Sequence, residues 1–309
     1  MMRAVTQPAV QLRSNLSVRL PLVAFLCAVL LGGGNFVAVR FSNRELEPLW
    51  GAGARFALAA VVFAVALFTT RIPLPKAQQL PMLGLYGFLA FGVSYALLYV
   101  GMQEVPAGVA AVVMAVGPLL TLLLATLQHL EKLHVRALAG AVIAFAGSAA
   151  MFAQPQDVEF SWLRLGAVCL AAVSAAESVV IAKRCGRQHP VAMNAVGMAT
   201  GAVALLAGSL IVGETWALPR HSATVLAFSY LVIASVALFV LVLVVVQRWT
   251  ASASSYIFVL MPPVAVVLGA ALGGEPITMA TVLGGLAVLA GVYIGALHRR
   301  PAQAPGSST

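Results

Sequence analysis

The sequence predicts an all-α membrane protein whose ten transmembrane helices form two inverted five-helix repeats, with both termini in the cytoplasm. Three observations support this fold class. Hydrophobic residues make up 61% of the 309 positions and charged residues only 9%, whereas soluble domains are about 25% charged. The apolar residues form continuous runs of about 20, the length at which a helix crosses a bilayer. A pattern of proline, glutamate and glycine also recurs at a constant offset of 144 positions.

The continuous runs favour helices over a closed β-barrel, because a barrel strand alternates apolar and polar residues. Short polar segments separate the runs, for example residues 40–45 and 154–157. The first run has the basic lead-in of a signal peptide, but it continues past Gly32-Gly33-Gly34, which favours a retained helix. The predicted spans are residues 20–39, 48–69, 80–101, 106–127, 135–153, 161–182, 190–212, 223–246, 252–273 and 278–297.

Basic residues set the predicted orientation, because cytoplasmic loops carry an excess of Lys and Arg. With the N-terminus inside, 13 of the 18 Lys and Arg lie in cytoplasmic segments, four lie outside, and Arg55 falls within a span. These loop charges also account for the net charge of +9, so no nucleic-acid partner is expected. We expect a disordered cytoplasmic tail (1–18), two repeats (19–153 and 161–297) and a second cytoplasmic tail (298–309).

The repeated motif is a proline followed by glutamate 13 positions later, glycine nine positions after that, and a second glycine after seven more. Its offset covers five spans, an odd number, so the second half must enter the membrane from the opposite side. Inverted repeats are typical of secondary transporters, whose substrate site lies near the midplane between the repeats. The matched pairs are Pro118 and Pro262, Glu131 and Glu275, Gly140 and Gly284, and Gly147 and Gly291.

With these motifs, the sequence resembles the drug/metabolite transporter superfamily, EamA-type, over about residues 20–297. The resemblance rests on Gly34-Asn35-Phe36-Val37, on residues 54–60, and on the repeated block Pro-x12-Glu-x8-Gly-x6-Gly. It implies ten helices in two repeats, a multi-pass location in the cell (inner) membrane, and transport of amino acids, other metabolites or drugs. The sixth span departs from the first, because Val179 stands at the position that corresponds to Asn35.

Polar residues inside the spans are the candidates for substrate binding, because lipid disfavours such groups unless they serve a site or a bond. Glu177 is interpreted either as a group that binds an amine or exchanges a proton, or as a hydrogen-bonded structural carboxyl. Ser174 and Ser178 lie one turn apart beside it, although hydroxyls also bond neighbouring helices. The predicted substrate-binding residues are Asn35, Tyr95, Tyr99, Ser174, Glu177, Ser178 and Tyr256.

Arg55 is a further candidate with two interpretations. It lies near the outer interface in the predicted topology, where it either serves the function or pairs with Glu45 or Glu47. An embedded charge is expensive in lipid in either case, so a partner is expected.

The motif residues Pro118 and Pro262 are expected to kink their helices, either as gating hinges or as fixed bends. Pro263 follows the second of them, so the sharper break is predicted there. Glu131 and Glu275 are expected to open the fifth and tenth helices and to interact with the positive ends of those helix dipoles.

The sequence therefore predicts a secondary transporter, an exporter of small metabolites such as amino acids, in which the two halves rock around a central cavity. Its partners are a small-molecule substrate, the bilayer and, as a candidate coupling ion, protons. No cofactor, metal or enzymatic activity is expected, because a GK[ST] phosphate loop is absent and His129 and His134 are not four positions apart. Multidrug efflux by the same fold, passive facilitation and an intramembrane enzyme or lipid-handling scaffold stay open, as does the oligomeric state.

Overall fold

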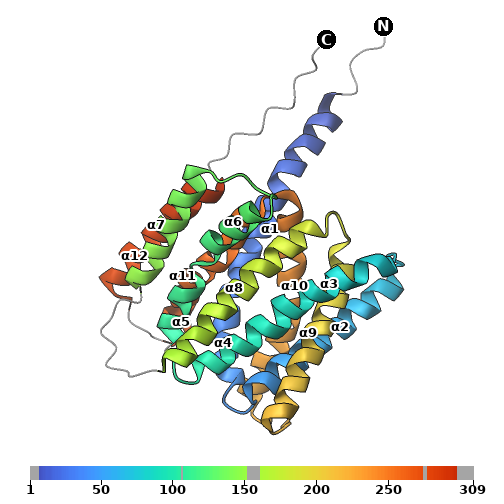
Figure 1. The fold of residues 1–309 in the computed structure, drawn as a ribbon, viewed down its shortest axis with the longest axis vertical. Helices are drawn as coiled ribbons and strands as arrows, with labels where there is room; N and C mark the ends of the chain where they lie inside the picture. Colours follow the sequence, from blue (N-terminus) through green and yellow to red (C-terminus); the bar gives the residue numbers. More distant parts are fainter. Residues whose placement is uncertain (1–6, 106, 152–160, 274–276, 298–309) are drawn as a thin grey trace.

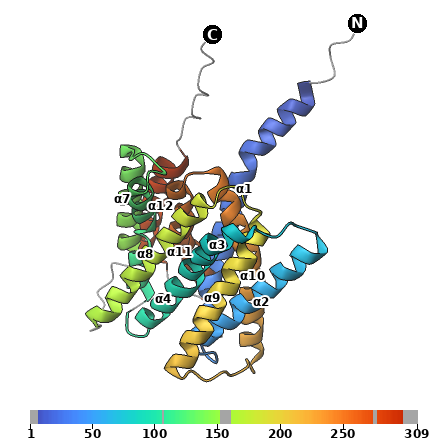
Figure 2. The ribbon, with the colours of Figure 1, turned by 45° about the vertical axis from the view of Figure 1, so that its right-hand side comes forward.

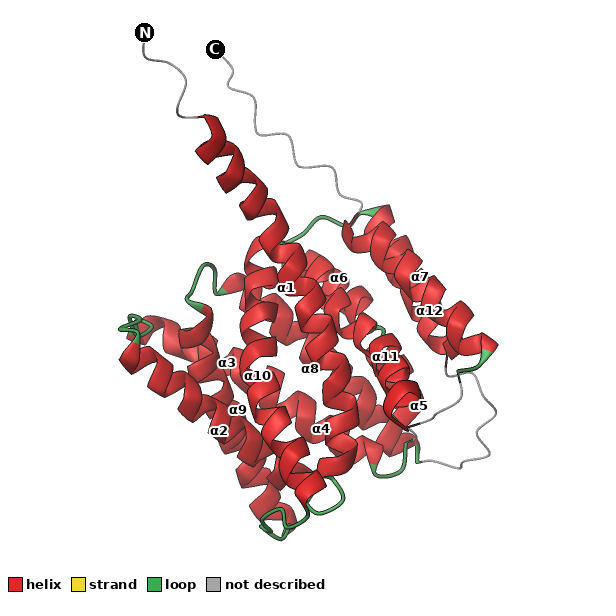
Figure 3. Cartoon of the chain, turned by 180° about the vertical axis from the view of Figure 1, so that it is seen from behind, coloured by secondary structure: helices red, strands yellow, loops and turns green. Residues whose placement is uncertain are grey.

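The computed structural model describes residues 7–105, 107–151, 161–273 and 277–297, and every regular element among them is a helix (Figures 1 and 3). The elements are α1 (Gln7–Ser42), α2 (Pro48–Thr69), η1 (Ala77–Gln79), α3 (Leu80–Gly87), η2 (Phe88–Val93), α4 (Ser94–Met102), α5 (Ala107–Met114), α6 (Gly117–Leu127), α7 (Val135–Met151), α8 (Trp162–Arg184), α9 (Pro190–Val212), α10 (Ser222–Arg248), α11 (Ala251–Gly273), α12 (Met279–Val292) and η3 (Tyr293–Leu297). α1 begins and η3 ends at the same end of the bundle (Figure 1).

The N-terminal helix is longer than the sequence predicted. α1 includes residues 7–18, for which we expected a disordered tail. The remaining tail residues, 1–6 and 298–309, lie outside the described part of the chain.

The helix surfaces are those of a membrane protein. Eight helical segments among the described residues are long and apolar enough to span a bilayer, and two shorter apolar helices, Leu20–Asn35 and Val135–Met151, accompany them. Large apolar side chains point outward along these helices, with Phe68 77%, Leu226 71% and Ile211 85% exposed. Because apolar surface on this scale is stable against lipid and not against water, the chain is a multi-pass membrane protein.

The most extensive helix packing joins the first half of the chain (19–153) to the second (161–297). α2 packs along α9, and α7 packs along α12 (Figures 1 and 2). α1 packs on α10 and α11, and α8 packs on α3–η2–α4 and on α5–α6. We call the first set (α1, α10, α11) packing group 1 and the second (α3 to α6, α8) packing group 2. A shift of 144 positions converts each group into the other, so the packing follows the sequence repeat.

Glycines of the repeated motif bring α7 and α12 together. A Cβ atom on Gly284 would lie 2.5 Å from the carbonyl oxygen of Gly147, and one on Gly147 would lie 2.7 Å from that of Gly284. A Cβ on Gly291 would lie 2.5 Å from the backbone nitrogen of Ala144. Two helix backbones approach this closely in a membrane only where the facing residues are small.

Two spans of the first half are irregular. The third carries a π-helix, η2, between α3 and α4, and the fourth is interrupted between Met114 and Gly117. Pro118 lies in the first turn of α6, where the missing N–H has no intrahelical partner to lose. α11 runs through Pro262 and Pro263 without interruption. The sharper break is therefore in the first half, opposite to the prediction from the paired prolines.

The motif glutamate of the first half caps a helix of the second. The Glu131 carboxylate accepts hydrogen bonds from the backbone N–H of Ser252 (3.1 Å) and from its hydroxyl at the start of α11. We expected Glu131 to open the helix that follows it, but α7 begins only at Val135, so the carboxylate is free to reach the positive end of α11. Its counterpart Glu275 lies outside the described residues.

Candidate functional site

Six aromatic side chains from α2, α3, η2, α4 and α10 gather in the interior of the bundle. The Phe56 ring lies at their centre, with ring centroids 5.0 Å from Phe91, 4.9 Å from Tyr95 and 6.4 Å from Phe239. Since α10 belongs to the second half, residues from both halves build this feature. We call it the aromatic cluster; its members are Phe56, Tyr86, Phe91, Tyr95, Tyr99 and Phe239.

The sequence identified only two members of this cluster. Tyr95 and Tyr99 were predicted as substrate-binding residues, and their ring centroids lie 6.3 Å apart on α4. The phenylalanines gave no signal, because an apolar residue in an apolar run is indistinguishable from one that faces lipid.

The guanidinium of Arg55 is buried against the aromatic cluster. The residue is 2% exposed, and its Cζ lies 4.5 Å from the ring centroid of Phe56 and 5.1 Å from that of Tyr95. Two of its nitrogens, Nε and Nη2, are buried without a hydrogen-bond partner. Of its two predicted partners, Glu45 is bonded elsewhere: its carboxylate accepts backbone N–H groups at the start of α10. Arg55 therefore holds unsatisfied donors inside the bundle.

Glu177 is held by a glutamine that the sequence did not predict. Nε2 of Gln128 donates to both carboxylate oxygens of Glu177, at 2.8 and 2.7 Å. The Gln128 carbonyl in turn accepts from Nη2 of Arg184 at 3.2 Å. Glu177 precedes the last residue of α8 by seven positions, or about 10 Å along the axis. It therefore lies between the middle of the helix at Val173 and its end, and nearer to the middle.

Ser174 and Ser178 are buried on α8 but bond in different directions. The Ser174 hydroxyl donates to the carbonyl of Leu89 in η2 (3.0 Å), and the Ser178 hydroxyl donates to the carbonyl of Ala175 in its own helix (2.7 Å). The first bond fixes α8 to the π-helix that carries Phe91. The second satisfies the hydroxyl locally and joins no other helix.

The other predicted residues lie on helices that contribute no ring to the aromatic cluster. Asn35 is on α1 and Tyr256 on α11, both in packing group 1, and Oδ1 of Asn35 is buried without a partner. The Tyr256 hydroxyl donates to the carbonyl of Ala137 on α7 (3.3 Å), which joins α11 to α7. Pro118 and Pro262 lie on α6 and α11, which pack against each other.

A buried amide on α9 was missed. Asn194 accepts a hydrogen bond from the Tyr86 hydroxyl (3.4 Å), and its Nδ2 is buried without a partner. Ser235 on α10 is likewise buried with an unpaired Oγ. An amide within the apolar run 190–212 was a usable signal, since lipid disfavours such groups.

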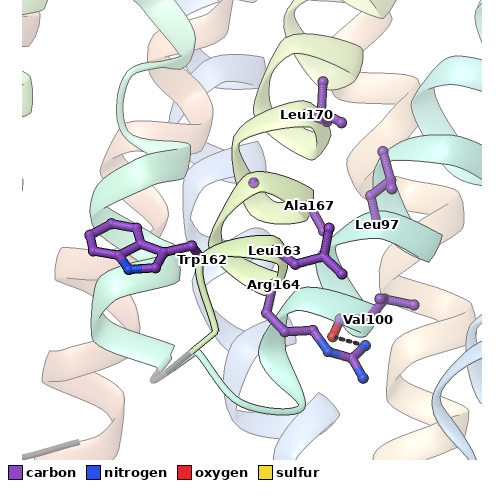
Figure 4. A pocket seen from close by; sticks show the side chains of 8 residues that line it. Leu97, Val100, Trp162, Leu163, Arg164, Ala167 and Leu170 are labelled. Carbon is purple, nitrogen blue, oxygen red and sulfur yellow. Dashed lines mark hydrogen bonds between the residues drawn. The ribbon is translucent and has the colours of Figure 1, made fainter. Parts of the chain in front are cut away.

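A hollow on the surface lies between α4 and the start of α8 (Figure 4). Its charged lining residue, Arg164, is already bonded: Nη1 donates to the Val100 carbonyl (3.1 Å) and Nε to Glu104 (3.1 Å). None of the predicted site residues lines it, and its walls are mostly apolar, so it is a surface feature apart from the polar groups above. The lining residues are Leu97, Val100, Trp162, Leu163, Arg164, Gly166, Ala167 and Leu170.

Two ionisable groups outside the spans, Glu45 and Cys185, have shifted pKa values. Desolvation raises the pKa of Glu45, but hydrogen bonds from the backbone of His221 and Arg220 and from the Thr224 hydroxyl outweigh it and lower the pKa to about 2. Burial raises the pKa of the Cys185 thiol to about 11.

Within the described ranges, no three His, Cys, Asp or Glu side chains are grouped so that they could hold a metal ion.

Comparison with known proteins finds a family model and several relatives that match this chain. The model of the EamA-like transporter family matches the chain twice, over residues 19–153 and 162–296. The chain is 30% identical to an uncharacterized inner membrane transporter, YedA, of Escherichia coli (strain K12), over 84% of this chain and 85% of that protein. It is 27% identical to the threonine/homoserine exporter RhtA of Salmonella typhimurium (strain LT2), over 80% and 82%. A solved crystal structure superposes with a TM-score of 0.76 at 18% identity, over 90% of this chain and 98% of the other.

Proposed function

This chain belongs to the EamA-like transporter family, and from that premise we propose that it is a secondary transporter that exports small metabolites such as amino acids. The observation that carries the proposal is that the two packing groups are built in the same way from equivalent helices of the two repeats. In one group α1 packs on α10 and α11, and in the other α8 packs on α3–α4 and α5–α6. Two halves related in this way, with buried polar groups between their helices, are the architecture in which transporters bind substrate at the repeat interface. The threonine/homoserine exporter RhtA, at 27% identity, favours amino acids as the substrate class.

The proposed topology has ten crossings, with both termini in the cytoplasm of a cell whose inner membrane holds the protein. The two shorter apolar helices, Leu20–Asn35 and Val135–Met151, would complete the eight longer candidates. Entry of α1 and exit of η3 at the same end require an even number of crossings (Figure 1). The excess of Lys and Arg places that end inside, and the relative YedA is an inner membrane transporter.

We propose alternating access around a midplane site between the two repeats. Because the extensive packing crosses between the halves, the bodies that move are the two packing groups, each built from both repeats. One difference between the groups is that α5–α6 is interrupted before Pro118, while α11 is continuous through Pro262. An exchange of these two conformations between the groups would convert a site open to one side into a site open to the other.

Protons are the proposed coupling ion, and Glu177 is the proposed carrier. Its carboxylate is partly buried and bonded to the Gln128 amide, which can satisfy it without neutralising its charge. Glu177 and Gln128 lie on α8 and at the end of α6, within packing group 2. A movement of α6 would change the hydrogen bonds that Glu177 receives from Gln128.

Counterflow into proteoliposomes tests the function. Purified full-length protein is reconstituted with one unlabelled solute inside in each preparation: threonine, leucine, phenylalanine, a sugar or a neutral aromatic dye. Uptake of the matching labelled solute identifies the substrate class. Uptake of the amino acids supports the proposal, and failure to transport any solute would remove it.

Multidrug efflux is the second candidate, and the aromatic cluster favours it. The Arg55 guanidinium against the Phe56 and Tyr95 rings forms a surface that suits flat apolar cations poorly but flat apolar acids and neutral compounds well. Dye counterflow without amino-acid counterflow would select this alternative.

A further inference from the structure

We propose that Arg55 is the anchor for a carboxylate on the transported solute, so that the substrates of this protein are small acids with an apolar or aromatic portion. The inference rests on the proposed transport function and names its substrate class. It starts from a guanidinium that is 2% exposed, with Nε and Nη2 buried and unpaired. Buried polar groups in proteins nearly always have partners, and donors on a charged group are the most expensive to leave without one.

The two unpaired nitrogens form one edge of the guanidinium. The N–H bonds of Nε and Nη2 on that edge point in the same direction, so together they bind the two oxygens of one carboxylate. A single unpaired nitrogen would suit a water molecule or a carbonyl equally well. A complete free edge specifies a planar anion with two oxygens.

Five of the six carboxylates in the described residues are engaged elsewhere, Glu104 among them through Arg164. The sixth, Glu47, is exposed, whereas Arg55 is buried. Glu45 is bonded at the start of α10, Glu131 at the start of α11, Glu177 to a glutamine, and Glu214 at the start of α2. The described salt bridges also leave Arg55 out. Within the described residues, no buried carboxylate is left to complete the edge, which favours a carboxylate from a bound molecule.

The surroundings of the edge define the rest of the ligand. Phe56 and Tyr95 lie against the guanidinium, and the rings of Phe91 and Phe239 continue the apolar wall, with centroids 4.7 Å apart. Aromatic neighbours hold the cation by cation–π attraction and exclude water, which strengthens its attraction for an anion. A molecule with one carboxylate and an apolar body matches one cation beside an aromatic wall. A dianionic phosphate would need a second cation.

Arg55 also lies at a useful depth. It follows the first residue of α2 by seven positions, about 10 Å along the helix axis. This is within the span yet close to one end, so a solute that leaves or enters through that end would meet the guanidinium on its way.

Matched acids and carboxamides test the proposal. The probes are L-leucine, L-phenylalanine and L-threonine, each paired with its carboxamide, which keeps the size and loses the anionic oxygens. Binding to the full-length protein in detergent is measured from the ligand-induced shift in unfolding temperature. Wild type is expected to bind at least one acid with a Kd about tenfold or more below that of its carboxamide, the loss expected when a charged bidentate pair is removed.

Variants assign the preference to Arg55. Arg55→Met should bind acid and carboxamide alike, and Arg55→Lys should retain a reduced preference, because lysine keeps the charge and loses the bidentate edge. The matched control is Arg44→Met, since the Arg44 guanidinium also lies over an aromatic ring (4.5 Å from Phe41) but on the exposed loop. It should keep the wild-type preference.

Each outcome decides. If wild type binds carboxamides as tightly as acids, or binds none of the acids, the proposal is overturned, and this measurement needs no variant to fold. An Arg55→Met protein that keeps the acid preference overturns it as well. Acid binding without counterflow of any solute would retain the carboxylate anchor and remove the transport function, so the two failures are distinguishable.

Discussion

Glu45 and Glu214 each cap the helix that follows the other one in the chain, and the two helices belong to different halves. Glu45 precedes α2 in the chain, yet its carboxylate lies at the start of α10; Glu214 precedes α10, yet its carboxylate lies at the start of α2. The backbone N–H groups of Leu49 and Trp50 donate to Glu214 at 3.0 and 2.7 Å. The two loops at this end are therefore tied together by helix capping.

Removal of the Glu214 cap is expected to destabilise the protein. Glu214→Ala leaves two N–H groups at the start of α2 without acceptors and removes a negative charge from the positive end of the helix dipole. We expect a loss of about 1–2 kcal/mol, measured as a lower unfolding temperature in detergent. The control is Glu47→Ala, because Glu47 stands at the N-cap of the same helix without a side-chain capping bond. Equal effects of the two substitutions would contradict the assignment.

Glu45 makes stability depend on pH in the acid range. Its pKa in the folded protein is about 2, below the ordinary value of 4.5, because hydrogen bonds from the start of α10 outweigh desolvation. The ionised form is thus favoured by folding, and the contribution is complete above pH 4.5 and lost as the pH falls towards 2. The difference in unfolding temperature between wild type and Glu45→Gln should be constant above pH 4.5 and should close below it. A difference that widens on acidification would refute this sign.

The contact between α7 and α12 should not tolerate one additional carbon atom at Gly284. Gly284→Ala places a Cβ 2.5 Å from the Gly147 carbonyl oxygen, so the helix backbones must separate. We expect a loss of roughly 1–3 kcal/mol, measured by unfolding in mixed micelles. Gly285→Ala is the matched control on the next residue, because its Cβ would meet nothing within 4 Å. Its stability should equal or slightly exceed that of wild type.

Proton coupling through Glu177 makes a separate prediction. Glu177→Gln removes the titrating proton and keeps a side chain that can bond Gln128, so the fold should persist. Uptake driven by a pH gradient should fall to background, while counterflow of the same solute should persist, because exchange requires no net proton movement. Gradient-driven flux equal to that of wild type would exclude Glu177 as the proton carrier.

Gln128→Ala separates positioning from coupling at that carboxylate. It removes both contacts to Glu177 (2.8 and 2.7 Å) and leaves the titrating group in place. Gradient-driven transport should continue with a shifted pH dependence. A complete loss of coupling in this variant would mean that the pair acts as one unit.

The sequence predicted the family, the helical class and the repeat. These depend on composition, on the length of the apolar runs and on the 144-position spacing of the motif residues, all of which can be read from a single sequence. It assigned Glu131 to the start of the wrong helix, since an acidic residue four positions before an apolar run indicates a cap for that run. Its actual partner, Ser252, is 121 positions away, and no local pattern reports such a contact. The location of the sharper proline break failed for a similar reason: helix continuity at Pro262 depends on how neighbouring helices pack.

The structure brings together some of the residues that the sequence singled out, and their role in binding stays a prediction. Arg55, Tyr95 and Tyr99 were identified because polar atoms stand out in an apolar run, and the structure brings these three together. Phe56 and Phe91 could not be identified, because their roles depend on which face of each helix points inward. Gln128 was read as part of a loop, since its bond to Glu177 appears only when α6 and α8 are placed side by side.

The crossed packing also has a consequence for how the chain is made. α2 ends at residue 69, and its main partner α9 begins at residue 190. The partners of α1, which are α10 and α11, are synthesised later still. During synthesis the early helices must therefore reside in lipid with their future contact faces unoccupied until the last spans are inserted. Assembly would be completed late, and two separately translated halves that meet in the same bilayer would have every principal contact available to them.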